Sequence, residues 1–506
     1  MNKSKSISIR RGSAAVLASL LLAGLAPARA QLPTLGDGSE LGSAAEKRLG
    51  ERIAREMFRD PDYIDDPVLA EYVRGIWQPL LDAARARGEL TAELDGRFAW
   101  QVLLGKDRVV NAFALPGGWL GLQLGLINVT TSRDEIASVL AHELSHVTQR
   151  HISRLASEEK KSTPLLIGAM LLGVLAMGKN PEAGNAVLAG GQAAVMQGQL
   201  NFSRDMEREA DRIGYGVLTQ AGFQPQGFVT MFEKLQQASR NNDSGSFPYL
   251  RTHPLTTERM ADMQSRLQLL PKAPPTPAPV ALEHALMAAR SKAVSSTGVD
   301  DLRALVRDAD VLQPGGSRQR RAAVYYAGSL AASKLRDPTR AETYAQKLAD
   351  EVRDDPNASR QARLLGAEVA LAAGQGARAL ALVGEPAASA PRPDVLLWAQ
   401  ARLATGGGAD VAQRLQTWVA TQPRDATAWE LLSSAYGAKG EPLRAIRADA
   451  EAQVAQLDYA AAVDRFRAAQ ELARRGGPGS DYIESSIIDT RTRQVESLLR
   501  EQSLER

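Results

Sequence analysis

Apolar residues recur every three or four positions between about residues 44 and 95, which is the period of an α-helix with one buried face. The clearest series places all its members on one side of such a helix: Val68, Leu69, Tyr72, Val73, Ile76, Leu80 and Leu81. We therefore expect two amphipathic helices in this part of the chain.

The pattern then changes to short runs rich in Val, Phe and Leu, which favour β-strands. Residues 98–104 and 108–114 form two such runs, and the intervening residues 105–107 suit a hairpin connection. After residues 115–118, which read Leu-Pro-Gly-Gly, a third apolar run reaches Val129. The pattern predicts a small antiparallel sheet.

A helix is expected next, because Ser132 and Glu135 have the spacing of a capping box at a helix start. Its apolar series is expected to continue past His151. Two further helices are expected, around residues 202–218 and 227–239.

The proline-rich segment 271–280 predicts an extended linker, because successive prolines are incompatible with both helix and strand. From residue 281 to residue 506 the sequence indicates Ala-, Leu- and Arg-rich helices broken by Gly or Pro. Trp429, Leu432 and Tyr436 have the spacing of the first helix of a tetratricopeptide (TPR) repeat. We expect a TPR-like repeat domain, and paired helices without a true repeat are the alternative.

Residues 1–30 have the features of a cleaved secretory signal. Basic residues precede an apolar stretch from about Ala14 to Leu25, and residues 28–30 give the A-x-A pattern of a cleavage site. An apolar core of about 12 residues is too short to span a hydrocarbon layer of ~30 Å, which disfavours an uncleaved anchor helix. We therefore expect export and cleavage after Ala30.

Charge separates the front of the chain from the rest. The sequence has 61 Lys and Arg and 58 Asp and Glu. Five of the basic residues lie in residues 1–30, which contain no acidic residue, so the mature chain keeps 56 basic side chains against 58 acidic ones. A chain this close to neutral has no general electrostatic basis for binding nucleic acid, and no nucleic-acid partner is expected.

The sequence contains no cysteine, which excludes a disulfide framework, a thiol nucleophile and any Cys-ligated metal. A metal would have to be held by His, Asp or Glu. Only five histidines are available, and three of them lie within ten residues: His142, His146 and His151.

The sequence His142-Glu143-Leu144-Ser145-His146 matches the motif H-E-x-x-H. Two histidines four positions apart project from the same helix face, so both imidazoles can bind one Zn²⁺. Glu143 lies on the adjacent face, where it can take a proton from the attacking water and pass it to the departing amine. By the same helical geometry His151 would face away from the pair, which predicts a structural role for it.

A catalytic zinc needs a third protein ligand, and the acidic helix around residues 203–211 offers one. Glu207 and Asp211 are four positions apart and share a face, so Glu207 can bind the metal while Asp211 accepts a hydrogen bond from a ligand imidazole. Glu209 points about 200° away from Glu207, which makes Glu207 the preferred candidate. A solvated acidic face is the alternative.

The segment Asn111, Ala112, Phe113 and Ala114 is predicted to be a strand near this site. If one edge of the strand is free, it can pair with an extended peptide and present a scissile carbonyl to the metal. An ordinary internal strand is the other interpretation.

Together these motifs resemble the HtpX/BepA group of gluzincin metallopeptidases. The resemblance includes Asn111-Ala-Phe-Ala-Leu-Pro-Gly-Gly118 before the histidine pair and Thr252-His253-Pro254 after the acidic helix. The export signal and the C-terminal helices are similar to the BepA-like (YfgC-like) periplasmic members. The resemblance implies an α+β gluzincin-type metallopeptidase domain over residues 31–270, mainly helical with a small antiparallel sheet, followed by an all-α TPR-like helical repeat domain.

The resemblance also implies the roles of the site residues. It implies one Zn²⁺ per chain, held by His142, His146 and Glu207, with Glu143 as general base and Asp211 behind a ligand histidine.

His253 resembles a family histidine that approaches the metal from a mobile loop. That residue can fill the fourth zinc position and hold a latent state, or, as in other members of the group, it can stabilise the oxyanion. The role of His253 is left open between the two.

At the level of biology the resemblance implies a periplasmic zinc-dependent endopeptidase in quality control and assembly of outer-membrane β-barrel proteins, with some chaperone activity. Its partners would be unfolded or stalled outer-membrane proteins, and the repeats would bind the β-barrel assembly machinery. The alternative is a TPR-based chaperone or scaffold whose proteolytic activity is latent or minor.

One apolar run has no role in this scheme. Leu165 to Met177 is almost wholly apolar but too short to span a bilayer. A buried hairpin is one interpretation, and a peripheral contact with a membrane or a client protein is the other.

Overall fold

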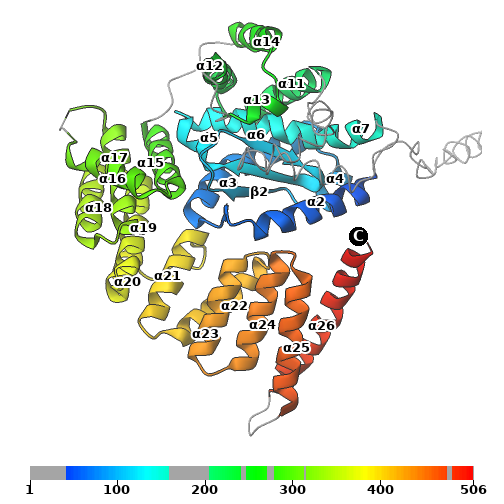
Figure 1. Ribbon diagram of the computed structural model, residues 1–506, viewed down its shortest axis with the longest axis vertical. Helices are drawn as coiled ribbons and strands as arrows, with labels where there is room; N and C mark the ends of the chain where they lie inside the picture. Colours follow the sequence, from blue (N-terminus) through cyan, green and yellow to red (C-terminus); the bar gives the residue numbers. More distant parts are fainter. Residues whose placement is uncertain are drawn as a thin grey trace, which may run out of the picture. The chain divides into compact units, whose positions relative to one another are not determined.

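The computed structural model describes residues 42–158, 204–240, 247–269, 278–312, 315–475 and 481–504. The expected signal, the apolar run 165–177 and most of the expected linker lie outside these residues. From Leu41 onward the chain forms one compact unit (Figure 1). In the part that is described, no helix is long and apolar enough to cross a membrane.

The N-terminal part of this unit is helical, as the apolar period predicts. It contains α2 (Ser43–Arg59), the short strand β1 (Tyr63–Ile64), α3 (Pro67–Ala86) and α4 (Ala92–Arg97). Helix α3 begins at Asp66, whose carboxylate accepts a hydrogen bond from the Leu69 amide at 2.9 Å. Proline has no backbone N–H, and the first turn of a helix has no carbonyl acceptor for one, so Pro67 is well placed there. Asp66 and Pro67 together fix the start of the helix.

The sheet is mixed, so the expected antiparallel sheet and its first hairpin are wrong. Its described strands are β1, β2 (Gln101–Gly105), β3 (Ala112–Leu115) and β4 (Trp119–Gln123), in the order β1-β2-β4-β3. Strand β4 pairs in parallel with β2 and antiparallel with β3. The most buried strand, β4, takes the centre of the sheet, and the chain after β2 crosses to the far edge instead of turning back.

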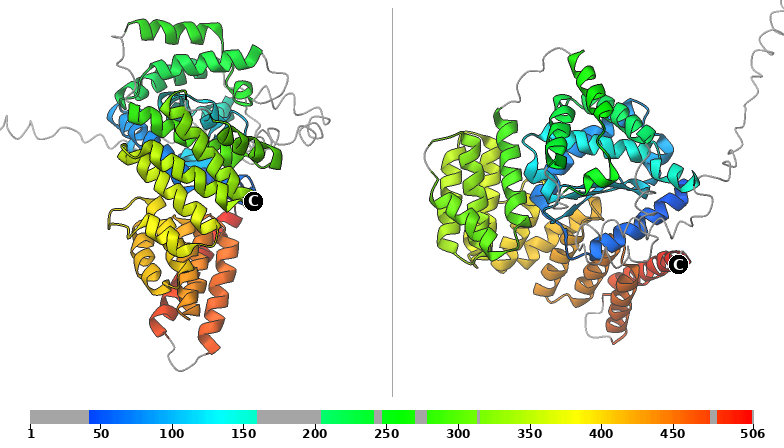
Figure 2. Two further views of the ribbon diagram at one scale, coloured as in Figure 1. Left: turned by 90° about the vertical axis from the view of Figure 1, so that its left-hand side faces the viewer. Right: turned by 45° about the horizontal axis from the view of Figure 1, so that its top comes forward.

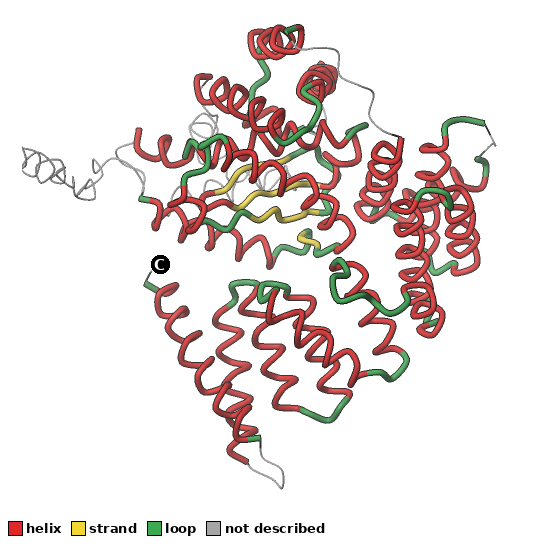
Figure 3. The backbone as a smooth tube through the Cα atoms, turned by 180° about the vertical axis from the view of Figure 1, so that it is seen from behind, coloured by secondary structure: helices red, strands yellow, loops and turns green. Residues whose placement is uncertain are grey.

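Each face of the sheet is covered by a different layer of helices (Figure 3). Leu104 and Leu122 point into the core that contains α3, whereas Leu103 and Trp119 pack in a second cluster with Ile53 of α2. This alternation is the period of two expected for strands buried on both faces. The 3₁₀ turn η1 (Pro116–Gly118), with Gly117 at φ 72°, joins β3 to β4.

The third apolar run predicted from the sequence contains two elements, because α5 (Leu124–Val129) follows β4 directly. Helix α6 (Arg133–Thr148) then begins as expected, with Ser132 Oγ accepting a hydrogen bond from the Glu135 amide. It does not continue past His151. The backbone of Arg150 is left-handed, with φ 53°, and a new helix, α7 (His151–Glu158), starts in another direction.

We call the described residues between 42 and 269, where a peptidase domain is expected, the peptidase part. Its remaining helices are α11 (Arg204–Gln220), α12 (Gln226–Arg240), α13 (Tyr249–Thr252) and α14 (Thr257–Gln268). Helix α11 packs closely on α6. A Cβ at Gly214 would lie 3.1 Å from backbone atoms of Ala141 and His142, so glycine permits the close approach of the two helices.

All the described secondary-structure elements from Ala278 onward are helices, and after the first of them each helix packs against the next one (Figure 2). Helix α15 includes the last residues of the expected linker. The helices are α15 (Ala278–Ser295), α16 (Val299–Asp310), α17 (Arg318–Lys334), α18 (Pro338–Val352), α19 (Pro356–Ala372), α20 (Gly376–Val383), α21 (Arg392–Ala404), α22 (Gly408–Thr421), α23 (Ala426–Ala438), α24 (Pro442–Ala455), α25 (Tyr459–Arg475) and α26 (Tyr482–Ser503).

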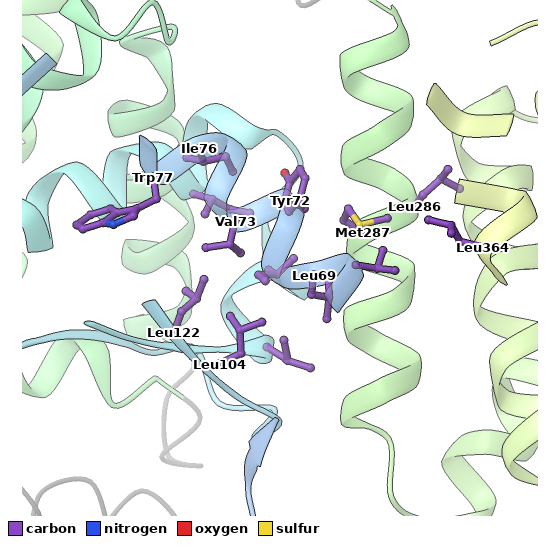
Figure 4. Packing of buried hydrophobic residues seen from close by; sticks show 14 of the residues in the cluster. Leu69, Tyr72, Val73, Ile76, Trp77, Leu104, Leu122, Leu286, Met287 and Leu364 are labelled. Carbon is purple, nitrogen blue, oxygen red and sulfur yellow. The ribbon is translucent and has the colours of Figure 1, made fainter. Parts of the chain in front are cut away.

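One hydrophobic core runs from the sheet into the first of these helices. Figure 4 shows side chains of α3 lying between Leu104 and Leu122 of the sheet and Leu286 and Met287 of α15, with Leu364 of α19 beyond them. Burial of this continuous apolar surface holds the first C-terminal helices against the peptidase part.

Three arginines of the C-terminal helices reinforce this contact. Arg290, on α15, donates to Asp66 of the peptidase part at 2.9 Å and to Glu368 of α19 at 2.7 Å. The same arrangement recurs twice, with one arginine between a carboxylate of the peptidase part and a carboxylate of the helices: Arg360 between Glu71 and Asp394, and Arg392 between Asp65 and Asp425. We call these nine residues the docking triplets.

Candidate metal centre

Helix α6 presents the first two histidines as the motif predicts. The Nε2 atoms of His142 and His146 lie 3.0 Å apart, and both side chains are buried. The side chain of Glu143 extends from α6 towards β3, and its Oε2 accepts a hydrogen bond from the Ala114 amide at 2.9 Å. In the part of the chain that the structure describes, the other oxygen, Oε1, accepts no hydrogen bond.

Helix α11 brings a carboxylate to each histidine. The two oxygens of Glu207 lie 3.5 Å from the Nε2 atoms of His142 and His146. Asp211, one turn later, lies on the other side of His142, with its Oδ1 2.9 Å from Nδ1. The shared helix face predicted from the sequence therefore places one carboxylate at the nitrogens that face the cluster and the other behind them.

His253 joins this cluster from the residues that follow α13. Its Nδ1 lies 3.0 Å from Glu207 Oε1, and its Nε2 lies 3.5 Å from Glu143 Oε1. Its ring packs against Tyr249, with ring centroids 4.7 Å apart. The loop thus brings this imidazole into the cluster beside the carboxylate expected to act as the base.

The chemistry of this cluster fits a bound Zn²⁺. Potential ligand atoms of His142, His146, Glu207 and His253 all lie within 4.8 Å of one another, and all four residues are buried. Imidazole nitrogens and a carboxylate are ordinary zinc ligands. Three imidazoles that converge in a buried space are difficult to satisfy with protons alone, whereas one cation between them satisfies all of them.

Asp211 and Glu207 favour positive charge at His142, whereas burial and the neighbouring His142 lower the pKa of His146 well below its ordinary value. Burial by itself lowers the pKa of His142, but the carboxylates of Asp211 and Glu207 outweigh it and raise the pKa to about 9. Burial raises the pKa of Glu207, but the neighbouring His253 and His142 bring it well below its usual range. Burial also raises the pKa of Glu143, as expected of a carboxylate that exchanges a proton.

Sequence reasoning missed Arg259, which lies at the back of the centre. The side chain is 4% exposed and donates two hydrogen bonds to Asp211, at 2.6 and 2.8 Å. Its Nη1 lies 2.6 Å from Glu207 Oε2 and donates to the Pro254 carbonyl at 2.9 Å. The sequence carries no signal for this contact, because Arg259 and Asp211 are 48 residues apart and meet through tertiary packing.

The direction expected for His151 is wrong. The expectation extended α6 through residue 151, but the helix ends at Thr148 and the left-handed Arg150 turns the chain. His151 Nδ1 consequently lies 2.8 Å from His146 Nδ1, and its Nε2 lies 3.1 Å from Glu209 Oε2. Burial lowers the pKa of His151 to about 4.

Strand β3 contains three of the four residues predicted to bind substrate, Ala112, Phe113 and Ala114, and Asn111 precedes it. It is the last strand in the sheet order, with β4 as its strand partner within the described ranges. The hydrogen bond from the Ala114 amide to Glu143 shows which way this edge faces. The sheet thus presents an edge at the centre.

Two helices that converge on one cluster of histidines and carboxylates, beside a sheet edge, define a metallopeptidase domain. Residues 78–267 match the model of Peptidase family M48. The chain is 33% identical over 324 residues to the Beta-barrel assembly-enhancing protease of Yersinia pestis, which covers 62% of this chain and 64% of that protein. These matches confirm the resemblance to BepA-like metallopeptidases.

Two further relatives show how far the similarity extends. The Beta-barrel assembly-enhancing protease of Escherichia coli (strain K12) is 35% identical over 260 residues, 50% of this chain and 51% of that protein. The Mitochondrial metalloendopeptidase OMA1 of Arabidopsis thaliana is 33% identical over 210 residues, 42% of this chain and 37% of that protein. The chain therefore spans between about a third and two thirds of the length of these three relatives.

Proposed function

We propose that this protein is a zinc-dependent endopeptidase. The observation that carries the proposal is the buried cluster of His142, His146, Glu207 and His253, with the Glu143 carboxylate beside it. Within the described residues Glu143 Oε1 accepts no hydrogen bond, which costs stability, and buried groups of this kind are typical of catalytic sites. The M48 match over residues 78–267 supports the same chemistry.

In this proposal His142, His146 and Glu207 hold one zinc ion per chain. Bound Zn²⁺ would polarise the scissile carbonyl and lower the pKa of water in the centre. Asp211 Oδ1 lies 2.9 Å from His142 Nδ1, and this contact keeps Nε2 of that ring directed at the cluster. Arg259 holds the Asp211 carboxylate in place.

Glu143 moves the proton. Its Oε1 takes a proton from the attacking water as the oxygen adds to the scissile carbonyl carbon, and the same proton passes to the amine nitrogen as the C–N bond breaks. The Ala114 amide donates to Oε2, which leaves Oε1 for this task. Because Ala114 belongs to β3, a peptide paired with this strand would lie next to the base.

His253 has two roles open to it in this scheme. As a fourth zinc ligand it would hold a latent state, and its loop would have to move before substrate enters. As an oxyanion stabiliser it would donate to the developing negative charge, which is typically worth about 10²–10³ in rate. The two roles give opposite results for His253→Ala, since cleavage rises in the first case and falls in the second.

We further propose a periplasmic location, after cleavage of the signal at Ala30, and action on unfolded or stalled outer-membrane β-barrel proteins. The names of the bacterial relatives support the link to β-barrel assembly. The C-terminal helices would form the TPR-like repeat that binds the β-barrel assembly machinery. The competing function is a chaperone or scaffold, which the closeness of His253 to Glu143 favours because it leaves the base covered.

The direct test is cleavage of casein and of a urea-unfolded outer-membrane barrel protein by the purified protein. Glu143→Gln keeps the side-chain shape but cannot take the proton, so cleavage should fall by about 10²–10⁴-fold. Glu93→Gln, at an exposed carboxylate on α4, is the matched control and should cleave like the wild type.

Equal cleavage by the wild type and Glu143→Gln would contradict the enzymatic proposal. If Glu143→Gln stops cleavage but still promotes barrel-protein folding, the chaperone function is independent of proteolysis.

A further inference from the structure

We propose that His151 is a positioning residue that holds the zinc ligand His146 in its binding tautomer and links it to Glu209 and Arg154. The inference depends on the proposed zinc site. It concerns a residue outside the cluster itself, and none of the roles assigned above involves it.

The break after α6 is what brings His151 to this position. In a continuous helix residue 151 would point away from residues 142 and 146. Here Arg150 adopts φ 53°, a conformation that is costly for a residue with a side chain, and the chain restarts as α7 with His151 as its first residue. Arg150 is held by Glu46, whose Oε2 accepts from Nε at 3.1 Å. This strained turn at Arg150 brings the imidazoles of His146 and His151 into contact.

A single assignment of protons satisfies the contacts among His146, His151 and Glu209. His146 directs Nε2 at the cluster, so its ring proton is on Nδ1 and is donated to Nδ1 of His151 at 2.8 Å. His151 therefore carries its own proton on Nε2, which donates to Glu209 Oε2 at 3.1 Å. The opposite assignment would place a proton on His146 Nε2, where the metal has to bind.

The far end of this chain of residues is anchored by an ion pair. Arg154 donates to Glu209 Oε2 at 2.8 Å, and both residues are partly exposed, whereas the His151 side chain is buried. The arrangement resembles the one behind the other ligand histidine, where Arg259 holds Asp211 and Asp211 holds His142. The two ligands thus have similar supports, except that an imidazole is inserted between His146 and its carboxylate.

This arrangement predicts how the metal is held. An outer partner that fixes the tautomer of a ligand histidine is typically worth about 10–100-fold in metal affinity. His151→Phe keeps an aromatic ring but removes both nitrogens, so zinc affinity should fall by about that factor. His151→Asn should restore most of the affinity, because its amide oxygen can take the place of Nδ1 as the acceptor for His146.

The experiment measures zinc affinity by competition with a chromophoric chelator, and the rate of zinc loss to excess chelator, in the full-length protein. Thermal unfolding of the zinc-free variants reports on the fold. Glu209→Ala provides a second route that leaves the buried ring unchanged, and it should weaken zinc binding less than His151→Phe does. His284→Phe removes another buried histidine and is the matched control, with the zinc affinity of the wild type expected.

Two results would overturn the inference. One is a wild-type zinc affinity in both His151→Phe and Glu209→Ala. The other is an equal loss of affinity in His151→Phe and His151→Asn, which would show that packing and not the acceptor matters. If the wild type itself binds no zinc, the proposed function fails, and that result is distinct from both.

Discussion

The metal centre and the docking triplets both bury carboxylates beside arginines, but they differ in how completely the charges are paired. Each carboxylate of the triplets receives at least one N–H from Arg290, Arg360 or Arg392. In the centre, Arg259 donates a hydrogen bond to Asp211 and forms an ion pair with Glu207, while Oε1 of Glu143 has no hydrogen bond within the described ranges.

This difference distinguishes charges that hold the fold from charges that do chemistry. The carboxylates and guanidinium groups of the triplets pair with each other and require no further ion or proton, so we assign the triplets a structural role. The converging imidazoles can be satisfied by a cation, and Glu143 Oε1, which accepts no hydrogen bond within the described ranges, can take a proton. We therefore assign the centre a functional role. Pairing, more than burial, separates the two regions.

The largest expected effect comes from removing the buried arginine of each region. Arg259→Met and Arg290→Met each leave two carboxylates without their cation, and loss of one partner of a buried ion pair typically costs about 3–5 kcal/mol of unfolding free energy. Zinc should restore part of the stability of Arg259→Met, because the metal is a second cation beside Glu207.

Urea unfolding with and without zinc measures both variants. Zinc should leave the deficit of Arg290→Met unchanged, since the triplets lie outside the cluster. Equal rescue of both variants, or of neither, would remove the distinction between the two regions.

A smaller effect is expected from glycines that differ in the space around them. Gly214→Ala places a Cβ 3.1 Å from the backbone of α6 at Ala141 and His142, so α11 has to shift, at a cost of about 1–3 kcal/mol. Gly75→Ala, in the middle of α3, meets nothing within 4 Å and should stabilise the protein by about 0.5–1 kcal/mol.

The stability of both glycine variants can be measured by thermal unfolding, and their zinc content by elemental analysis. Zinc binding should be weaker in Gly214→Ala but unchanged in Gly75→Ala, because Glu207 and Asp211 lie on the helix that shifts. A Gly214→Ala protein with wild-type stability and zinc content would contradict the close approach of α6 and α11.

The smallest effect concerns pH and the contact between α15 and the peptidase part. Neutral His284 accepts a hydrogen bond from the Tyr72 hydroxyl at Nδ1 and donates from Nε2 to the Thr130 carbonyl. Burial lowers the pKa of His284 below its ordinary value of 6.5, even though the Thr130 carbonyl and nearby Glu135 oppose the shift. The unfolded chain then binds more protons below pH 6.5, so stability falls as pH decreases from 6.5 towards the folded pKa.

Urea unfolding between pH 7.5 and about 5 tests this expectation. His284→Phe should be less stable than the wild type at pH 7.5 and should lose less stability as the pH falls. Parallel pH profiles for the two proteins would show that His284 does not titrate in this way.

The sequence predicted the site better than the topology around it. His142, Glu143 and His146 are close in sequence on one helix, and Glu207 and Asp211 on another, so helical period alone groups them correctly. The mixed sheet was missed because strand order depends on which strand is buried most deeply, and local runs of Val, Phe and Leu do not contain that information.

The same limit explains the errors at His151 and Arg259. The end of α6 depends on one left-handed residue, Arg150, which no helix signal marks. Arg259 contacts Asp211 across 48 residues of sequence, and such a contact follows from tertiary packing alone.

The central claim is that the cluster binds zinc, and the most direct test is zinc stoichiometry together with X-ray absorption at the zinc edge. We expect one zinc per chain after extensive dialysis, with nitrogen and oxygen ligands that include imidazoles, and loss of that zinc in the double variant His142→Ala and His146→Ala. A folded wild-type protein that retains no zinc, or a double variant that retains as much as the wild type, would contradict the account.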